Sequence, residues 1–126
     1  MPAQLEHVNY TVSDTQKTAA WMESLFGWHI RWEGDSMAGG YSMHVGTDTH
    51  YVALYAPPKA KTSGENNYAT VNGLNHIAVT VDDIGAMEQA VKDHGFTPGS
   101  HADYEPGKRF YFYDHDGIEY EVVSYA

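Results

Sequence analysis

The sequence contains no cysteine. Disulfides, thiolate metal sites and a cysteine nucleophile are therefore all excluded. It also has no apolar run near the roughly 18 residues that a membrane-spanning helix needs. Its first ten residues, MPAQLEHVNY, have neither the basic nor the apolar region of a signal peptide. We therefore expect a soluble, cytoplasmic protein.

Basic residues are scarce as well. Seven Lys and Arg stand against 17 Asp and Glu, which leaves a formal net charge of −10. Such a charge repels nucleic acid and anionic membrane surfaces, so neither is an expected partner. The chain is rich instead in His (8) and Tyr (10), whose side chains perform site chemistry as well as packing. The expected partner is a small-molecule substrate.

One segment of the sequence occurs twice. Residues 5–14 (LEHVNYTVSD) align with residues 74–83 (LNHIAVTVDD) at a constant offset of 69, and Leu, His, Thr, Val and Asp match identically. The other apolar positions match in kind. This agreement indicates an internal duplication.

Each copy predicts a strand, then a helix, then three more strands. Asp14 and Asp83 are suited to begin the helices as N-caps, and Gly27 and Gly95 to end them. Alternating β-rich segments follow at residues 28–33, 41–45 and 51–56, and at 96–103, 109–113 and 119–124. The predicted fold class is α+β: one domain of two tandem βαβββ modules, about 4–56 and 73–125. Residues 57–72, rich in Pro, Ser, Gly and Asn, form the expected linker.

Strand alternation places two histidines on equivalent faces. The apolar residues of each opening strand must pack under a helix, so His7 and His76 project from the opposite, concave face. On the last strand, Glu119 and Glu121 share one face. Two imidazoles and one such carboxylate form a ligand set that suits Fe(II), Mn(II), Zn(II), Co(II) or Ni(II). The alternative is that the duplication kept both histidines for packing alone.

The two openings, LEH at residues 5–7 and LNH at 74–76, and the ending FYFYDHDGIEYE at 110–121, resemble the vicinal oxygen chelate superfamily. It includes glyoxalase I, extradiol dioxygenases, fosfomycin-resistance thiol transferases, methylmalonyl-CoA epimerase and bleomycin-binding proteins. The resemblance covers nearly the whole chain and implies a pair of half-barrels with one divalent metal ion. The family's carboxylate ligand stands four residues after a turn glycine, here Gly117, which implies His7, His76 and Glu121 as ligands. His115 replaces the proline usual in that turn.

The resemblance to extradiol dioxygenases extends to two more residues. A Gly-x-His at residues 99–101 precedes Tyr111 and the Glu121 turn, with a spacer about one residue long. It implies Fe(II) as the metal, His101 as the acid/base and Tyr111 as a hydrogen-bonding partner of a substrate oxygen. We therefore expect ring cleavage of a small aromatic or oxygen-chelating substrate. The alternatives are a surface-loop role for His101 and a packing role for Tyr111.

Other members of the superfamily suggest other functions. Glyoxalase-like and epimerase-like enzymes resemble this chain less, because they place a ligand or base where this sequence has Ala53. A fosfomycin-resistance-like thiol transferase would need cations for a phosphonate, and Lys108 and Arg109 form the one adjacent basic pair near the expected cavity. A bleomycin-resistance-like binding protein needs no metal, and His7 and His76 argue against it. A planar ligand would be served by any of the aromatic residues Trp28, Trp32, Tyr41, Tyr51, Tyr55, Tyr111 and Tyr113.

Small modules with exposed strand edges commonly pair, so we expect a homodimer. Light scattering at micromolar concentration should give twice the monomer mass. A monomeric mass would contradict the prediction.

Overall fold

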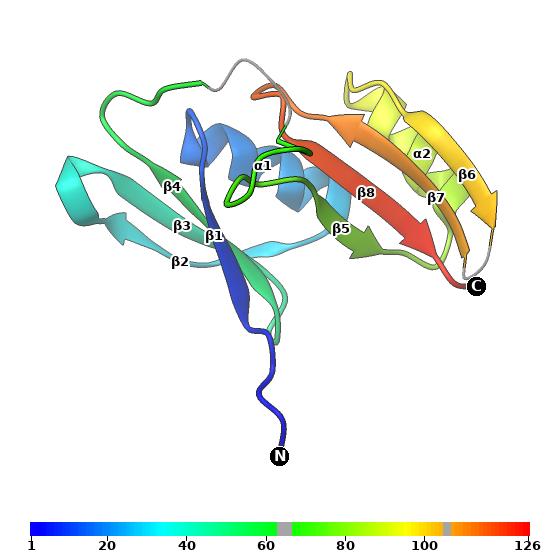
Figure 1. Cartoon of the computed structure of the whole chain (residues 1–126), viewed down its shortest axis with the longest axis horizontal. Helices are drawn as coiled ribbons and strands as arrows, with labels where there is room; N and C mark the ends of the chain where they lie inside the picture. The colour runs from blue at the N-terminus through cyan, green and yellow to red at the C-terminus, as the bar shows by residue number, and fades with distance from the viewer. Residues whose placement is uncertain (63–66, 105–106) are drawn as a thin grey trace. The chain divides into compact units, whose positions relative to one another are not determined.

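The computed structural model describes residues 1–62, 67–104 and 107–126, which divide into two compact modules, Met1–Thr62 and Ser63–Ala126. Each module holds a four-stranded mixed sheet with one α-helix against it (Figure 1). The predicted order of elements, βαβββ in each half, is confirmed. Part of the expected linker, residues 63–66, lies outside the described residues.

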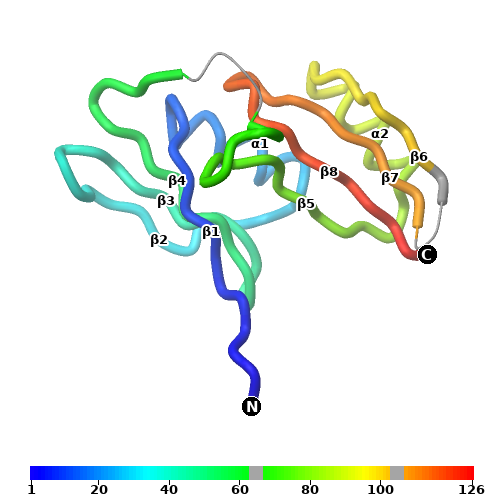
Figure 2. The backbone as a smooth tube through the Cα atoms, viewed as in Figure 1, coloured from blue at the N-terminus to red at the C-terminus, as the bar shows by residue number. Residues whose placement is uncertain are grey.

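The first module contains the strands β1 (His7–Thr11), β2 (His29–Asp35), β3 (Tyr41–Gly46) and β4 (Tyr51–Ala56), with helix α1 (Thr15–Phe26) and a short 3₁₀ turn (Met37–Gly39). The strand order across its sheet is β1-β4-β3-β2. β1 runs parallel to β4, whereas the other neighbours are antiparallel. The backbone trace in Figure 2 shows residues 1–6 leaving this sheet as an extended tail.

The second module repeats this topology. Its strands are β5 (Ile77–Thr80), β6 (Gly99–Tyr104), β7 (Gly107–Tyr113) and β8 (Glu119–Ser124), and its helix is α2 (Ile84–Asp93). The order is β5-β8-β7-β6, with β5 parallel to β8. β6 begins at Gly99, three residues later than the sequence predicts, because residues 96–98 contain Pro98, which cannot donate to a ladder.

Both predicted N-caps and the first predicted C-cap are present, whereas α2 has His94 as its C-cap and the expected Gly95 follows it with φ 98°. The Asp14 carboxylate accepts hydrogen bonds from the backbone N–H groups of Gln16 and Lys17 at 3.0 and 3.1 Å. Asp83 accepts from Ala86 N at 2.9 Å. Gly27 closes α1 in the left-handed region, with φ 71°. These side chains satisfy backbone groups that a helix end leaves without partners.

The core of each module lies between its helix and its sheet. In the second module the buried side chains Phe110, Phe112, Tyr120 and Val122 face α2, where Val91 is fully buried. Residues of opposite parity on β7 and β8 therefore face away from the helix. Neither helix in the described chain has the length and apolar character needed to cross a membrane.

Candidate metal centre

In the second module a histidine and a carboxylate meet on the side of the sheet away from α2. His76 lies directly before β5, and Glu121 lies on β8 opposite Ala78 of β5. The His76 Nε2 atom is 3.0 Å from Glu121 Oε1, and the Glu121 side chain is only 7% exposed. The pair is thus held by the parallel pairing of two strands.

The Asn75 side chain orients the His76 ring. His76 Nδ1 lies 2.6 Å from the side-chain oxygen of Asn75, which can only accept, so Nδ1 donates to it. Nε2, the other ring nitrogen, lies 3.0 Å from Glu121 Oε1. A proton or a metal ion between these two atoms would balance the negative charge of the carboxylate. This donor set fits a divalent metal ion, and Asn75 supplies the outer hydrogen bond that usually orients a metal-binding imidazole.

Arg109 holds the second oxygen of the same carboxylate. Its Nη1 donates to Glu121 Oε2 at 2.8 Å, and the Arg109 side chain is 15% exposed. A largely buried, charge-assisted hydrogen bond fixes the rotation of the carboxylate. Glu121 therefore presents one oxygen to Arg109 and the other to His76.

Tyr111 joins this cluster from β7. It is paired with Glu121 across the β7–β8 ladder, and its ring meets His76 edge-on with ring centroids 5.6 Å apart. The structure thus brings together three of the residues singled out from the sequence: His76, Glu121 and Tyr111.

His7 has a similar setting in the first module. Its Nδ1 is 2.8 Å from Glu6 Oε1, as His76 Nδ1 is 2.6 Å from the Asn75 side-chain oxygen. The hydrogen bond from His7, followed by one from the Tyr51 hydroxyl, lowers the pKa of Glu6. Both expected histidine ligands therefore have the preceding side chain as an orienting partner.

The first module has no carboxylate in the place of Glu121. Asn9 and His44 flank Ala53 in its ladders as Ala78 and Tyr111 flank Glu121, so Ala53 is the counterpart of Glu121, as the sequence alignment predicts. Within the described residues of either module taken alone, no three His, Asp or Glu side chains gather closely enough to hold a metal ion.

The structure does not bring His101 to the His76–Glu121 pair. His101 Nε2 is 2.7 Å from Glu88 Oε1 of α2, and its ring lies over Phe110, so it faces the helix side of the sheet. A β-bulge between Gly99 and Ala102 and a left-handed Ser100 (φ 52°) turn the side chain this way. The ion pair lowers the pKa of Glu88, the bond to His101 being the main cause.

The bulged strand also borders a pocket of about 390 Å³ on this side of the sheet. It lies between the start of α2 and strands β6 and β7, and it is lined by Ile84, Gly85, Glu88, His101, Ala102, Lys108, Arg109 and Phe110. Arg109 is thus shared between this pocket and the contact with Glu121.

Glu119, on the same strand as Glu121, has a different partner. It is 6% exposed, because the Tyr68 hydroxyl, from the segment before β5, donates a hydrogen bond to Glu119 Oε1. This bond is the main cause of a raised pKa for Tyr68, and a bond to the same carboxylate raises the pKa of Tyr113. Glu119 therefore has Tyr68 as its hydrogen-bond partner, separate from the His76–Glu121 pair.

The turn before β8 needs no proline. Asp114 Oδ1 accepts from the backbone N–H groups of Asp116 and Ile118 at 2.9 and 3.1 Å, and Gly117 has φ 76°. Burial raises the pKa of Asp114, whereas these two bonds oppose the rise. The turn that positions Glu121 is therefore closed with His115 at the usual proline position.

Sequence reasoning missed three residues around these clusters. Arg109 was noted only as a cation, although its parity with Tyr111 places it on the face of Glu121. His44 could have been found as the repeat counterpart of Tyr111. Tyr68 lies outside the duplicated segments, and no pattern signals it.

A family model for the glyoxalase/bleomycin resistance protein/dioxygenase superfamily matches residues 4–122. The chain belongs to this superfamily. No curated protein matches it.

Solved structures with the same fold are numerous. A glyoxylase/bleomycin resistance protein/dioxygenase domain from Frankia sp. EAN1pec has a TM-score of 0.81 at 18% identity, covering 98% of this chain and 93% of that one. The fosfomycin resistance protein FosX from Mesorhizobium loti has a TM-score of 0.74 at 22% identity, covering 98% and 92%. FosX from Listeria monocytogenes, solved with Mn(II) and sulfate, has a TM-score of 0.76 at 19% identity, covering 98% and 93%. At these identities the likeness shows the fold alone.

Substitutions of the two β8 carboxylates, Glu119 and Glu121, should have different effects on metal binding and on stability. We expect Glu121→Gln to weaken metal binding strongly, because it removes the charge that offsets a divalent cation. Glu119→Gln should keep the metal equivalent and lose about 1–2 kcal/mol of unfolding free energy, since it weakens a charge-assisted hydrogen bond. Metal titration and urea unfolding measure the two effects, and Tyr68→Phe is the matched control for the second. Metal loss in Glu119→Gln alone would place the strand register two residues off.

Proposed function

We propose that this protein is a metal-dependent enzyme that binds one divalent ion through His7, His76 and Glu121. The observation that carries the proposal is the 3.0 Å approach of His76 Nε2 to Glu121 Oε1 while His76 Nδ1 is bonded to Asn75. The equivalent Nδ1 contact of His7 supports it as the third ligand. Fe(II) is our first choice, with Mn(II), Zn(II), Ni(II) or Co(II) as alternatives. Manganese in a FosX of the same fold supports the general class of ion.

The substrate would be a small molecule that offers two adjacent oxygen atoms. A bound divalent ion supplies Lewis-acid chemistry to such oxygens. Arg109 neutralises part of the Glu121 charge, so the site favours a substrate that arrives as an anion. We propose that Tyr111, whose ring meets His76 edge-on, hydrogen-bonds a substrate oxygen, and this contact with a proposed metal ligand supports the role.

Extradiol-type ring cleavage remains our first choice of reaction. It would consume one dioxygen per catechol and place both oxygen atoms in the ring-opened product. Tyr111 supports this choice. His101 has no part in it, because its imidazole faces Glu88 on the helix side.

A second candidate is fosfomycin-resistance-like thiol transfer, which Arg109 favours as a cation beside Glu121. Lys108 is exposed and of opposite parity on β7, so it would not assist there. Glyoxalase-like isomerisation is disfavoured because Ala53 cannot move a proton. The homodimer and the cytoplasmic location stay predictions.

The ligand set can be tested without knowing the substrate. We expect His7→Ala and His76→Ala each to lower metal affinity by orders of magnitude, with the far-ultraviolet circular dichroism spectrum kept. His101→Ala is the matched control and should bind a full metal equivalent, because its ring pairs with Glu88. Metal analysis by mass spectrometry checks all three. A full equivalent in either ligand variant would falsify the set.

The reaction is tested on protein loaded anaerobically with Fe(II). Catechol should then cause dioxygen uptake with one-to-one stoichiometry, and Glu121→Gln should abolish it. Mn(II)-loaded protein with fosfomycin and a thiol tests the second candidate, by loss of free thiol. Thiol consumption without dioxygen uptake would reverse our order of preference.

A further inference from the structure

The two modules carry different chemistry at equivalent positions. In the second module, Glu121 and Tyr111 are paired across the ladder, and Arg109, two residues before Tyr111 on β7, donates to Glu121. The first module has Ala53 and His44 at the corresponding pair, with Trp32 continuing the row on β2. A methyl group and an imidazole thus replace the carboxylate and the phenol.

The rings of the first module form a continuous series, which we call the stacking face: Trp32, His44, Tyr51 and His7. Trp32 and His44 lie 5.1 Å apart between centroids, and His44 and Tyr51 4.8 Å apart with an interplanar angle of 27°. Tyr51 and His7 are also 4.8 Å apart, at 17°. The series ends on the imidazole proposed as a metal ligand. Trp32, at the other end, is 50% exposed.

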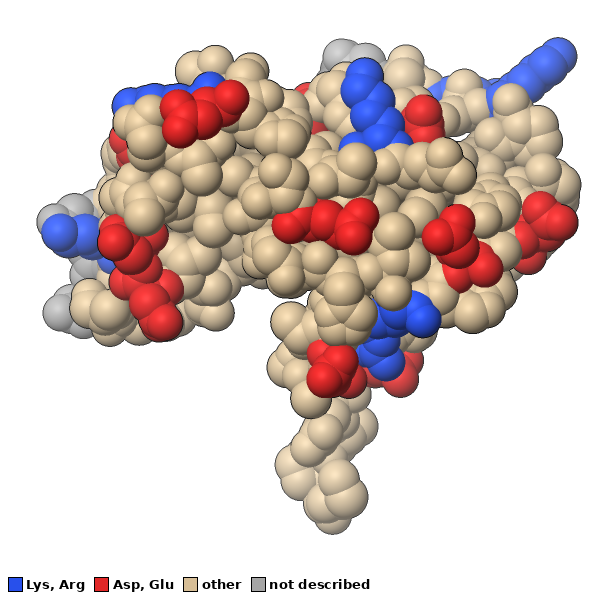
Figure 3. All heavy atoms as spheres, turned by 180° about the vertical axis from the view of Figure 1, so that it is seen from behind, with Lys and Arg blue, Asp and Glu red and all other residues tan. Residues whose placement is uncertain are grey.

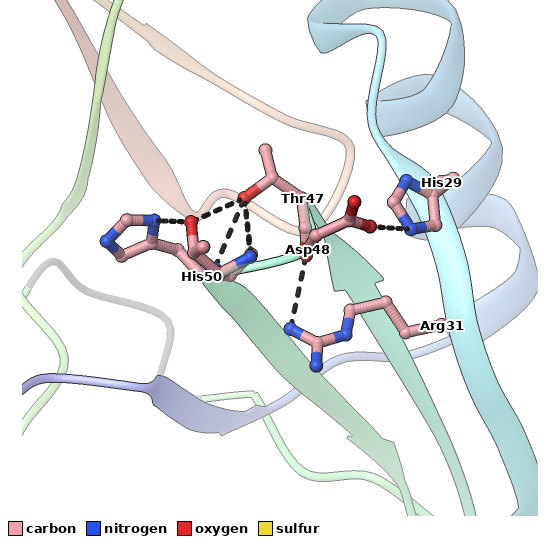
Figure 4. A network of polar contacts seen from close by, with 6 residues as sticks. His29, Arg31, Thr47, Asp48 and His50 are labelled. Atoms are coloured by element: carbon pink, nitrogen blue, oxygen red, sulfur yellow. Dashed lines mark hydrogen bonds and ion pairs between the residues drawn. The ribbon is translucent and has the colours of Figure 1, made fainter.

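Polar contacts hold these rings in place. The Arg31 guanidinium lies 4.3 Å from the centre of the Tyr51 ring. Its Nη1 donates to the Thr47 carbonyl at 3.1 Å, within the network of the β3–β4 turn (Figure 4). Glu6 accepts from the Tyr51 hydroxyl at 3.1 Å and from His7. Tyr51 is therefore fixed both at its face and at its hydroxyl.

A small side chain lies beside these rings on the same face. Ala53 pairs with His44 across the β3–β4 ladder and is 2% exposed.

We propose that the stacking face binds the planar aromatic ring of the substrate, whose two oxygens are directed toward the metal ligand His7. This inference rests on the proposed function, because it takes the metal site as the end of the series, and it names the substrate class as oxygen-bearing aromatic rather than aliphatic. Offset or tilted rings at these separations attract through dispersion and their quadrupoles. An aliphatic chelator gains nothing from such a surface.

The test compares two chelators, catechol and lactate, on metal-loaded protein by calorimetry. Trp32→Leu should weaken catechol binding about tenfold, the order expected of one lost ring–ring contact, and leave lactate unchanged. Trp28→Leu is the matched control, because Trp28 packs on Phe26 outside the stacking face. It should bind catechol as the wild type does, and catechol should still quench the fluorescence of the exposed Trp32 in it.

Two results would overturn the inference: equal catechol affinity in Trp32→Leu and wild type, or wild-type protein that binds lactate and not catechol. Failure of the proposed metal site would give a different result from failure of the stacking face. Protein that takes up no metal but binds catechol with the same dependence on Trp32 would refute the metal site and support the stacking face. Equal loss for catechol and lactate in Trp32→Leu would instead assign Trp32 a general packing role and contradict the proposal.

Discussion

The parallel pairing of β5 with β8 is the constraint on which the candidate site depends. It sets Ala78 opposite Glu121, and so brings His76, just before β5, within 3.0 Å of that carboxylate. A register slip of one residue would turn Glu121 toward the core, where a charge has no partner. The turn before β8 also fixes this register, because the Asp114 carboxylate accepts hydrogen bonds from the backbone N–H groups of Asp116 and Ile118 just before the strand begins.

The charge around Glu121 depends on its immediate neighbours more than on the net charge of the chain. The chain carries a formal charge of −10, yet Arg109 lies against the most buried of its candidate ligands. Lys and Arg are interspersed with Asp and Glu on the surface shown in Figure 3, so no broad basic patch steers ligands there. Because burial weakens screening, this largely buried guanidinium acts strongly on the Glu121 carboxylate despite the negative net charge.

Duplication gave both modules the same backbone, and the side chains on it have diverged. Both keep a histidine before or at the opening strand, oriented by the preceding residue. Beyond that, one ladder pair holds Tyr111 and Glu121, and its counterpart holds His44 and Ala53. The same backbone geometry thus holds a carboxylate in one module and an alanine beside stacked rings in the other.

The sequence by itself determined the fold class, the two repeats, the helix caps and the parity of His76 and Glu121, because strand alternation and capping are local properties. Only the tertiary structure decided which partners these side chains have. Arg109 and Glu121 are 12 residues apart in the chain and His101 and Glu88 are 13 apart, so strand pairing and helix docking bring each pair together. The bulge at Ser100 reversed the expected direction of His101, since one extra residue in a ladder exchanges the faces. Tyr68 buries Glu119 from a segment with no periodic signal, and no local rule could have placed it.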